Sequence, residues 1–225
     1  MESFLDLLFP PRCPGCREIL VERGVFCRSC RETFIELSAT RCRLCGEPEV
    51  ELCSHCRGQA PPFERADAAF LHGGALAETI HRLKYEDCPQ FARHLARLVL
   101  GAARSHLEWC TLVAPIPLHP SRLRGRGYDQ ALLLARPLAK AAARRLEPRA
   151  VRRRRHTAPQ VGRDRLARTR NVAGAFVGVP KRCAGQRVLL VDDVLTTGAT
   201  AGEAALALRE AGAAAVRVFT IARAE

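Results

Sequence analysis

One stretch near the carboxyl end of the chain combines acidic, hydroxyl and glycine residues in a spacing that could bind an anion. The apolar run Val188–Val191 precedes Asp192 and Asp193, and the segment Thr196–Thr200 follows with three threonines and Gly198. At the start of a helix, free N–H groups, hydroxyls and a glycine that permits close approach form a phosphate cradle. Two adjacent carboxylates would repel a bare phosphate, so they suit sugar hydroxyls or a divalent cation. A ribose 5-phosphate fits both parts of the segment, because its phosphate suits the cradle and its hydroxyls suit the acidic pair.

The cysteines form a second group with recognisable spacing, because eight of the 11 fall before residue 57 in four successive C-x-x-C pairs. The pairs are Cys13/Cys16, Cys27/Cys30, Cys42/Cys45 and Cys53/Cys56. Two such pairs complete a closed tetrahedral site, so we predict two structural zinc ions. Disulfides and thioredoxin-like chemistry fit four pairs in series less well. Pairing along the sequence needs only short loops, but a cross-braced arrangement uses the same cysteines, and the spacing leaves both open.

The length and the net charge of the chain limit the classes of protein to which it can belong. A chain of 225 residues can hold one ordinary α/β domain and a small module. The cysteine pairs stop before Gln59–Pro62, which predicts a cysteine-rich module in residues 1–60 and a larger domain in residues 61–225. The net charge of +13 favours phosphate or nucleic-acid partners, although arginines that only solvate surface helices would produce the same excess. No apolar run reaches the roughly 18 residues of a membrane span, and the acidic start does not resemble a secretory signal, so we expect a cytoplasmic protein.

Apolar periodicity predicts the elements that must position these residues. Strands are expected at Phe63–Leu71, Leu112–Pro117, Ala175–Val179, Arg187–Val191 and Val216–Ile221, and helices at Gly74–Leu83, Pro89–Ser105, Asp129–Leu146 and Ala199–Ala211. Strands that alternate with helices indicate an α/β fold with a mainly parallel sheet and flanking helices. The acidic pair would then lie at the carboxyl edge of that sheet, where α/β proteins bind ligands.

The segment Val188–Thr200 resembles the signature of type I phosphoribosyltransferases, with four apolar residues, two acids, two apolar residues and Thr-Thr-Gly-x-Thr. The resemblance implies a type I phosphoribosyltransferase-like fold that binds 5-phosphoribosyl diphosphate (PRPP) with Mg²⁺. It also implies that Asp192 and Asp193 are the catalytic pair that holds the ribose hydroxyls. The residues that would wrap the 5-phosphate are Thr196, Thr197, Gly198, Ala199 and Thr200. A P-loop is excluded because no Gly-Lys-Ser/Thr follows.

Further matches extend over nearly the whole chain. They comprise the cysteine pairs, Lys84 with Tyr85, Pro115–Leu118, Arg124–Gln130, Gln160, Asn171 and Phe176. Together they resemble the ComF family, competence-associated phosphoribosyltransferase-like proteins with an amino-terminal double zinc ribbon that are implicated in handling imported single-stranded DNA. At Tyr128 and Asp129 the chain departs from the Phe-Asn of the family. The resemblance implies a role in DNA uptake and natural transformation, with single-stranded DNA and a competence helicase or DNA-processing protein as partners.

The resemblance also implies functions for two arginine-rich segments. The loop after the strand near Leu112 would bind pyrophosphate, and within it Arg124 and Arg126 are the predicted contacts. The run Arg152–Arg155 leads into Gln160, Arg163, Arg165, Arg168 and Arg170. By position this stretch resembles the flexible loop that folds over PRPP, but it could equally follow a DNA backbone.

Three functions are therefore open. The first is a phosphoribosyltransferase that moves the phosphoribosyl group to an unknown acceptor as pyrophosphate departs through an oxocarbenium-like state. The second is a module that binds PRPP or single-stranded DNA without turnover in a competence complex. The third is a regulator in which PRPP occupancy changes nucleic-acid affinity, but no helix-turn-helix is evident in the sequence.

Overall fold

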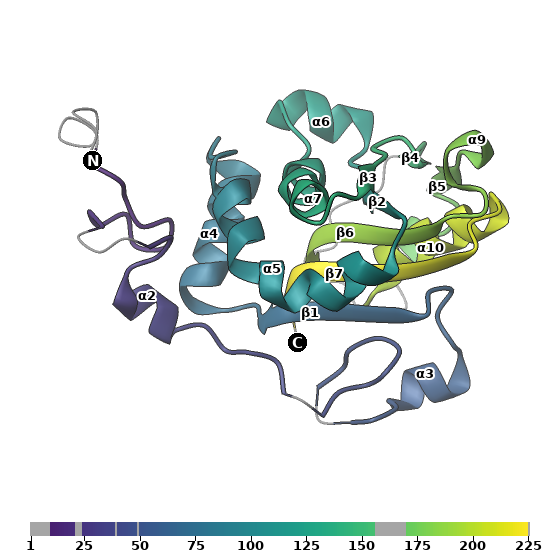
Figure 1. Cartoon of the computed structure of the whole chain (residues 1–225), viewed down its shortest axis with the longest axis horizontal. Helices are drawn as coiled ribbons and strands as arrows, with labels where there is room; N and C mark the ends of the chain where they lie inside the picture. The colour runs from purple at the N-terminus through teal and green to yellow at the C-terminus, as the bar shows by residue number, and fades with distance from the viewer. Residues whose placement is uncertain (1–9, 21–23, 39, 49, 156–169, 225) are drawn as a thin grey trace.

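The computed structural model describes residues 10–20, 24–38, 40–48, 50–155 and 170–224. At its centre lies a five-stranded parallel sheet with the strand order β1-β7-β6-β2-β3 (Figure 1). The strands of the sheet are β1 (Arg65–Leu71), β2 (Leu112–Pro115), β3 (Arg145–Leu146), β6 (Arg187–Leu195) and β7 (Ala215–Arg223). The helices around it are α4 (Gly74–Tyr85), α5 (Phe91–Trp109), α6 (Pro120–Arg126), α7 (Gln130–Ala141), α9 (Pro180–Cys183) and α10 (Ala199–Glu210). The predicted parallel α/β architecture is confirmed.

The central strands are buried on both faces, as their continuous apolar sequence predicts. In β6, Leu189 and Val191 pack into a core with α4, α5 and α7. The alternate residues Val188 and Leu190 pack into a second core with α10. The sheet therefore separates two hydrophobic layers, and the register of β6 is specified by burial on both sides.

Two predicted boundaries differ from the structure. Strand β6 does not end at Val191 but continues to Leu195, because its pairing with the parallel β7 runs as far as Leu195 and Arg223. Both acids therefore lie within a strand. The helix expected over Asp129–Leu146 is wrong in its extent: α7 ends at Ala141, Ala143 adopts a left-handed conformation with φ 50°, and the chain enters β3 beside β2.

A small antiparallel hairpin, β4 (Val151–Arg153) with β5 (Phe176–Gly178), stands apart from the main sheet. It rests on α10, and Gly178 allows the closest approach. A Cβ atom at this position would lie 2.3 Å from the carbonyl oxygen of Ala207, a separation that no side chain tolerates. The glycine therefore sets how near the hairpin lies to the helix that follows the threonine segment.

In its described residues, the cysteine-rich segment has little regular structure beyond the short helices α2 (Arg28–Glu32) and α3 (Ser54–Gly58). Its first part lies beside α4, and its second part lies near β1 (Figure 1). The second part makes a direct backbone contact, because the N–H of Ala66 in β1 donates to the carbonyl of Leu44 at 2.7 Å. Among the described residues, no helix is both long and apolar enough to cross a membrane.

Candidate functional site

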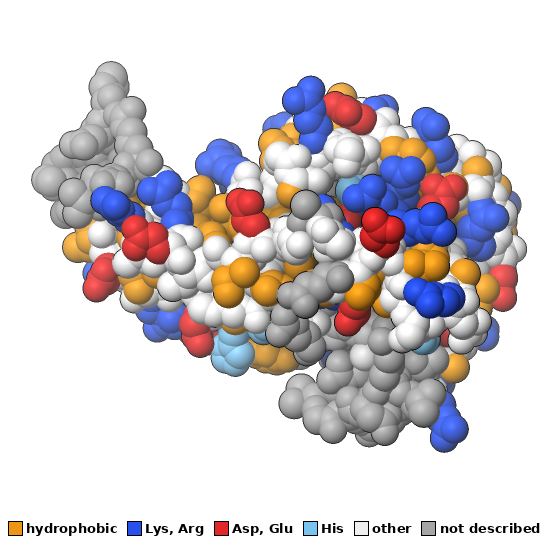
Figure 2. Space-filling model, turned by 90° about the horizontal axis from the view of Figure 1, so that it is seen from below, with side chains coloured by type: hydrophobic (Ala, Val, Ile, Leu, Met, Phe, Trp, Pro, Cys, Tyr) orange, Lys and Arg blue, Asp and Glu red, His pale blue; other side chains and the backbone are white. Residues whose placement is uncertain are grey.

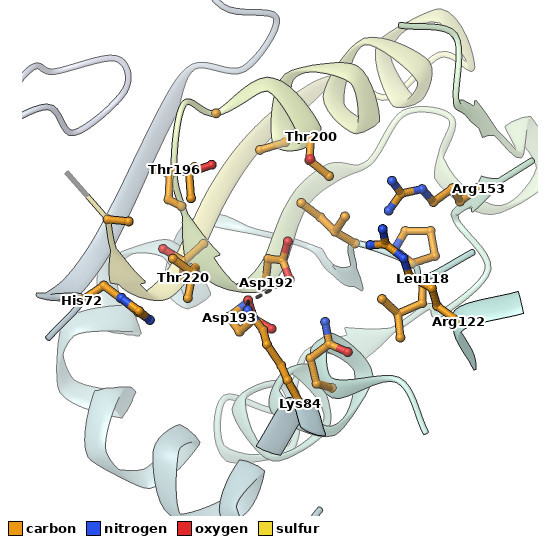
Figure 3. A pocket seen from close by; sticks show the side chains of 18 of the residues that line it. His72, Lys84, Leu118, Arg122, Arg153, Asp192, Asp193, Thr196, Thr200 and Thr220 are labelled. Carbon is orange, nitrogen blue, oxygen red and sulfur yellow. Dashed lines mark hydrogen bonds and ion pairs between the residues drawn. The ribbon is translucent and has the colours of Figure 1, made fainter. Parts of the chain in front are cut away.

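A cavity of about 470 Å³ opens at the carboxyl ends of β6 and β7 (Figure 3). One wall consists of Asp192, Asp193 and residues of the threonine segment, and Thr220 of β7 lies beside them. Arg122 and Arg153 come from outside the sheet and face this wall from the opposite side in Figure 3. The cavity therefore lies at the edge of the sheet where the sequence predicted a ligand site.

The two adjacent acids have different surroundings because successive residues of a strand point to opposite sides. Asp193 is 5% exposed, and its Oδ1 lies 2.8 Å from the Nζ of Lys84 at the end of α4. Its second oxygen, Oδ2, is buried without a hydrogen-bond partner among the described residues. Burial alone would lower the pKa of Lys84, but the carboxylate of Asp193 outweighs it and the pKa is raised. Lys84 is therefore an ammonium group.

Asp192 is half-buried and forms no such ion pair with any described residue, although its Oδ1 accepts a hydrogen bond of 2.9 Å from the backbone N–H of Asp193. Burial, followed by the proximity of Asp193, raises the pKa of Asp192 well above its usual value, with Lys84 opposing the shift. A second cation or a set of hydrogen-bond donors beside Asp192 would stabilise its charged form. The acidic wall is thus incomplete without a ligand that brings positive charge or hydroxyl groups.

The threonine segment forms a tight turn into α10. Gly198 is the residue before the helix and has φ 78°, a left-handed conformation that glycine adopts without strain. The hydroxyl of Thr197 accepts a hydrogen bond from the N–H of Ala199 at 3.4 Å, so it caps the turn. Thr196 and Thr200 line the cavity instead. The amino terminus of the 12-residue helix and two hydroxyl groups, Thr196 before the helix and Thr200 in its first turn, therefore face the cavity.

The opposite wall is basic. It contains Arg122 and Arg126 from α6 and Arg153 from β4. Arg126 donates to Gln130 Oε1 at 2.5 Å and lies 5.3 Å above the ring of Tyr85, so both its position and its orientation are restricted. Burial, followed by the charge of Arg122, lowers the pKa of Arg153. Two guanidinium groups close enough to oppose each other in this way favour an anion between them.

Arg122 and Arg126 lie on helix α6 and not in the loop that the sequence suggested. Pro120 occupies its first turn, and the imidazole of His119 accepts a hydrogen bond from the N–H of Ser121. Residues four apart share a face of a helix, so Arg122 and Arg126 both reach the cavity. Arg124, which the sequence analysis chose together with Arg126, does not line it. Had the helix been recognised, its spacing would have selected Arg122 in place of Arg124.

Most of the predicted site residues come together, but not all of them. Asp192, Asp193, Thr196, Gly198, Thr200 and Arg126 line the cavity, whereas Thr197 and Ala199 shape the turn behind it. Sequence reasoning missed the contributions of Lys84, Arg122 and Arg153. Strand alternation could have found Arg153, since β4 turns it toward the cavity while its neighbours Arg152 and Arg154 are exposed. Gln160, Arg163, Arg165 and Arg168 lie outside the described residues.

Tyr128 and Asp129 have structural roles next to this wall. The Tyr128 hydroxyl donates to the carbonyl of Leu83 at 2.6 Å. Asp129 caps α7 by accepting from the N–H of Leu132, and its other oxygen accepts from the N–H of Leu118. Burial raises the pKa of Asp129, although these hydrogen bonds act to lower it. The two residues in which the chain departs from the family pattern therefore connect α4, α7 and the segment that precedes α6.

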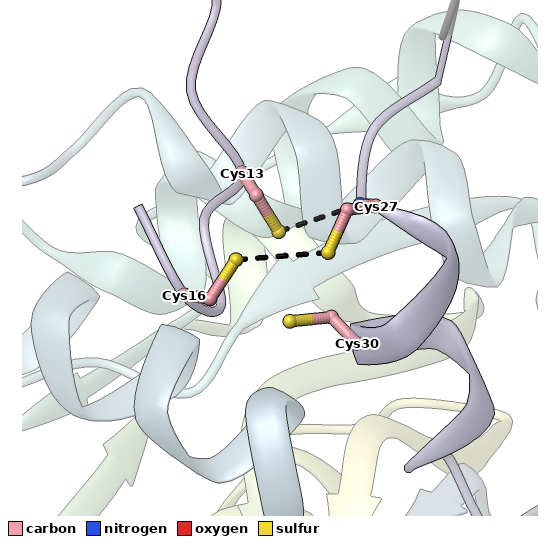
Figure 4. Close-up of side chains that lie close together, drawn as sticks. All are labelled: Cys13, Cys16, Cys27 and Cys30. Carbon is pink, nitrogen blue, oxygen red and sulfur yellow. Dashed lines mark hydrogen bonds between the residues drawn. The ribbon is translucent and has the colours of Figure 1, made fainter. Parts of the chain in front are cut away.

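The eight amino-terminal cysteines form two compact clusters that follow the order of the sequence. The first contains Cys13, Cys16, Cys27 and Cys30, and the second Cys42, Cys45, Cys53 and Cys56, with all sulfur atoms of a cluster within 4.8 Å of one another. Figure 4 shows the first cluster, in which Cys16 and Cys27 are 3.6 Å apart. A tetrahedral zinc ion with bonds of about 2.3 Å places its sulfurs about 3.8 Å apart. Both clusters fit structural metal sites, and the cross-braced pairing is excluded.

Comparisons with known proteins agree with this geometry. Residues 4–57 match the double zinc ribbon domain, and residues 131–225 match the phosphoribosyl transferase domain. The DNA utilization protein YhgH of Escherichia coli K12 is 32% identical over 227 residues, which cover 96% of this chain and 99% of the relative. Competence protein F of Haemophilus influenzae is 32% identical over 224 residues, which cover 95% and 97%. Competence protein ComFC of Streptococcus pneumoniae is 26% identical over 204 residues, covering 88% and 87%.

Among solved structures, the glutamine PRPP amidotransferase of Bacillus subtilis matches with a TM-score of 0.40 and 22% identity, covering 56% of this chain and 25% of that one. The two relatives at 32% identity align over nearly their whole length, and the zinc-ribbon match spans both cysteine clusters that the structure brings together. The chain therefore belongs to the ComF family of competence and DNA-utilization proteins, with a double zinc ribbon and a phosphoribosyltransferase-type domain.

Proposed function

We propose that the cavity binds PRPP together with Mg²⁺ and that the protein transfers the phosphoribosyl group to an acceptor nucleophile during the handling of imported DNA. The observation that carries this proposal is the opposition of two kinds of wall across one cavity. An acidic pair and a helix amino terminus lie on one side, and Arg122, Arg126 and Arg153 lie on the other. PRPP has the matching features, with ribose hydroxyls between a 5-phosphate and a pyrophosphate.

Each part of PRPP has a suitable place in this arrangement. The 5-phosphate fits the turn at Thr196–Thr200, where hydroxyls and the helix amino terminus converge. The ribose hydroxyls fit the acidic pair, since the buried Oδ2 of Asp193 has no donor among the described residues. The pyrophosphate fits the arginine wall, because guanidinium groups stabilise the charge that develops on a leaving group.

Mg²⁺ suits the donor set of the acidic wall, because carboxylate oxygens and substrate oxygens are its preferred ligands. Asp192 is the stronger candidate for such a role, since Lys84 already neutralises Asp193. When bound, the ion would neutralise charge on the pyrophosphate. The protein itself would orient C1 of the ribose toward the acceptor and exclude water from it.

Pyrophosphate release tests the transferase activity. PRPP and Mg²⁺ are incubated with the zinc-loaded protein and with candidate bases, nucleosides or single-stranded DNA, and pyrophosphate is quantified. We expect release that depends on one acceptor class and that is lost in the D192N/D193N variant. Tight binding of PRPP without release for any acceptor would instead support a non-catalytic module.

That second function, a module that binds PRPP or single-stranded DNA, is favoured by one further observation. Arg152 and Arg154 point away from the cavity and are exposed. Lys and Arg side chains are also frequent at the end of the molecule that carries α9, α10 and the β4–β5 hairpin (Figure 2). These cations could follow a DNA backbone while PRPP occupies the cavity, and a competence helicase or DNA-processing protein would be the natural partner. The cytoplasm, whose reducing environment keeps cysteine ligands free for zinc, suits both functions.

A further inference from the structure

Arg82 of α4 binds the first zinc ribbon, next to an ion pair between Arg17 of the ribbon and Glu86 at the end of the helix. Arg82 Nη1 donates to the carbonyl oxygens of Pro14 at 2.7 Å and Gly15 at 2.5 Å. These two residues are the ones between Cys13 and Cys16, so the arginine binds the backbone of the metal-ligating turn itself. The Arg82 side chain is only 13% exposed. Hydrogen bonds from a largely buried guanidinium group to carbonyls are stronger than those between neutral groups.

Packing reinforces this attachment along the length of α4. Cys13, Phe26 and Cys30 belong to the same hydrophobic core as Leu76 and Ile80 of the helix. At the start of α4, the N–H of Ala75 donates to the Thr33 hydroxyl at 3.2 Å. The first ribbon therefore covers one face of α4 from its first turn to Arg82.

The last turn of the same helix reaches the cavity. Lys84 follows Arg82 by two residues, and its Nζ lies 2.8 Å from Asp193 Oδ1 (Figure 3). The intervening Leu83 is fully buried, and its carbonyl accepts from the Tyr128 hydroxyl. A displacement of this helix end would move the one ammonium group that the structure places in the cavity.

We propose that Arg82 is a positioning residue that couples the first zinc site to the cavity by holding Lys84 against Asp193. The zinc ion orders the Cys13–Cys16 turn, the turn holds Arg82, and Arg82 holds the end of α4. Arg82 itself does not line the cavity and does not contact a zinc ligand side chain, so its effect on either site passes through the helix.

The lysine content of the chain offers a direct test that does not require PRPP. The sequence contains only three lysines, Lys84, Lys140 and Lys181, and the latter two are exposed. An ammonium group held by a carboxylate reacts slowly with an acylating reagent. The zinc-loaded full-length protein is treated with N-hydroxysuccinimidyl acetate, and mass spectrometry follows the acetylation rate of each lysine. Lys140 and Lys181 serve as internal standards.

We expect slow acetylation of Lys84 in the wild-type protein. In R82A, which removes both hydrogen bonds to the ribbon, the rate at Lys84 should rise by roughly tenfold or more relative to the internal standards. Removal of zinc by a chelator should raise it as well. The matched control is R28A, which removes the same charge from the ribbon at a surface ion pair with Glu32 and should leave the Lys84 rate unchanged.

A second variant keeps the test independent of the folding of R82A. T33V removes the contact between the ribbon and the first turn of α4, and it should raise the Lys84 rate by a smaller factor. Unchanged Lys84 rates in R82A and T33V would overturn the proposal. So would an increase that also occurs in R28A, or one that accompanies loss of the far-UV circular dichroism signal.

A final arm rests on the proposed function. Because coupling between two binding sites is reciprocal, PRPP with Mg²⁺ should slow zinc release to a chromogenic chelator in the wild-type protein but not in R82A. Equal protection of zinc by PRPP in both proteins would overturn the proposal. If PRPP does not bind the wild-type protein at all, the proposed function fails, while the Lys84 acetylation rates still decide whether Arg82 positions the cavity.

Discussion

The two walls of the cavity are built in different ways. Nine consecutive residues, Asp192–Thr200, supply the acidic pair and the threonine turn, and they leave β6 and enter α10 without interruption. The basic wall is assembled from α6 and β4, and Lys84 of α4 meets the acidic wall at Asp193. A wall made of one segment depends on local backbone geometry, whereas a wall made of separate segments depends on how distant elements pack. Substitutions should therefore affect the first wall locally and the second through its supports.

The strongest test of this comparison removes the charge of the acidic wall. In the D192N/D193N variant we expect PRPP affinity to fall by about 100-fold or more, because each lost charge-assisted interaction is worth roughly 1.5–3 kcal/mol. Isothermal titration calorimetry with Mg²⁺ present measures the change. The exposed Glu210 at the end of α10 provides the control E210Q, which should bind normally. Wild-type affinity in the double variant would remove the ribose assignment.

A second prediction separates the two sides of β4. Replacement of Arg153 by Ala should weaken PRPP binding by roughly 10-fold to 100-fold, since Arg153 lines the cavity. The double variant R152A/R154A should leave PRPP binding unchanged. If these two arginines contact phosphates of single-stranded DNA, the same double variant should reduce the salt slope of DNA binding by about 1.4, or 0.7 for each contact.

The same variants also show whether PRPP and single-stranded DNA share one site or occupy two. Loss of DNA binding in R153A together with loss of PRPP binding would indicate that both ligands occupy the cavity. An unchanged salt slope in R152A/R154A would assign those arginines to solvated surface. Replacing all four residues of Arg152–Arg155 at once would confuse these outcomes, because Arg153 alone points inward.

A smaller effect should distinguish neighbouring arginines of α6. Arg126 lines the cavity and is held by Gln130 and Tyr85, so R126A should lower PRPP affinity by about tenfold. R124A is the matched control, since Arg124 does not line the cavity. Equal losses in the two variants would indicate a general field of positive charge and not a shaped pyrophosphate site.

The smallest effects concern the stability of the ligand-free protein, where the two adjacent acids should act in opposite directions. Because the pKa of Asp192 is raised in the folded protein, the folded state retains its proton longer than the unfolded chain does. The free energy of unfolding should therefore fall as the pH rises from the usual value near 3.8 through the raised pKa. D192N removes this loss and should raise the melting temperature at neutral pH.

D193N should do the reverse, since it leaves the ammonium group of Lys84 without its carboxylate. We expect a destabilisation of roughly 1–3 kcal/mol, the usual cost of a partly buried polar group that loses its partner. Thermal unfolding from pH 4 to pH 8 measures both variants. A lower melting temperature for D192N at neutral pH would contradict the interpretation that Asp192 is strained without a ligand.

The sequence by itself determined the parts of the protein whose chemistry is local. Consecutive apolar residues, two acids and Thr-Thr-Gly-x-Thr predicted a strand, a turn and a helix amino terminus, and residue spacing within the cysteine pairs predicted the metal ligands. Both depend on neighbours along the chain, so the pattern of residue types is sufficient. The family resemblance rested on these stretches and on shorter matches such as Lys84 with Tyr85 and Arg124–Gln130.

Only the tertiary structure decided which cations meet the acidic wall and how the zinc sites are divided. Lys84 is 109 positions away from Asp193 and reaches it because α4 is packed between the sheet and the first ribbon. Arg122 lines the cavity in place of Arg124 because residues 120–126 form a helix. Arg153 lines it in place of its neighbours because of the register of the three-residue strand β4. Such choices depend on packing between distant elements, which no local spacing of residues encodes.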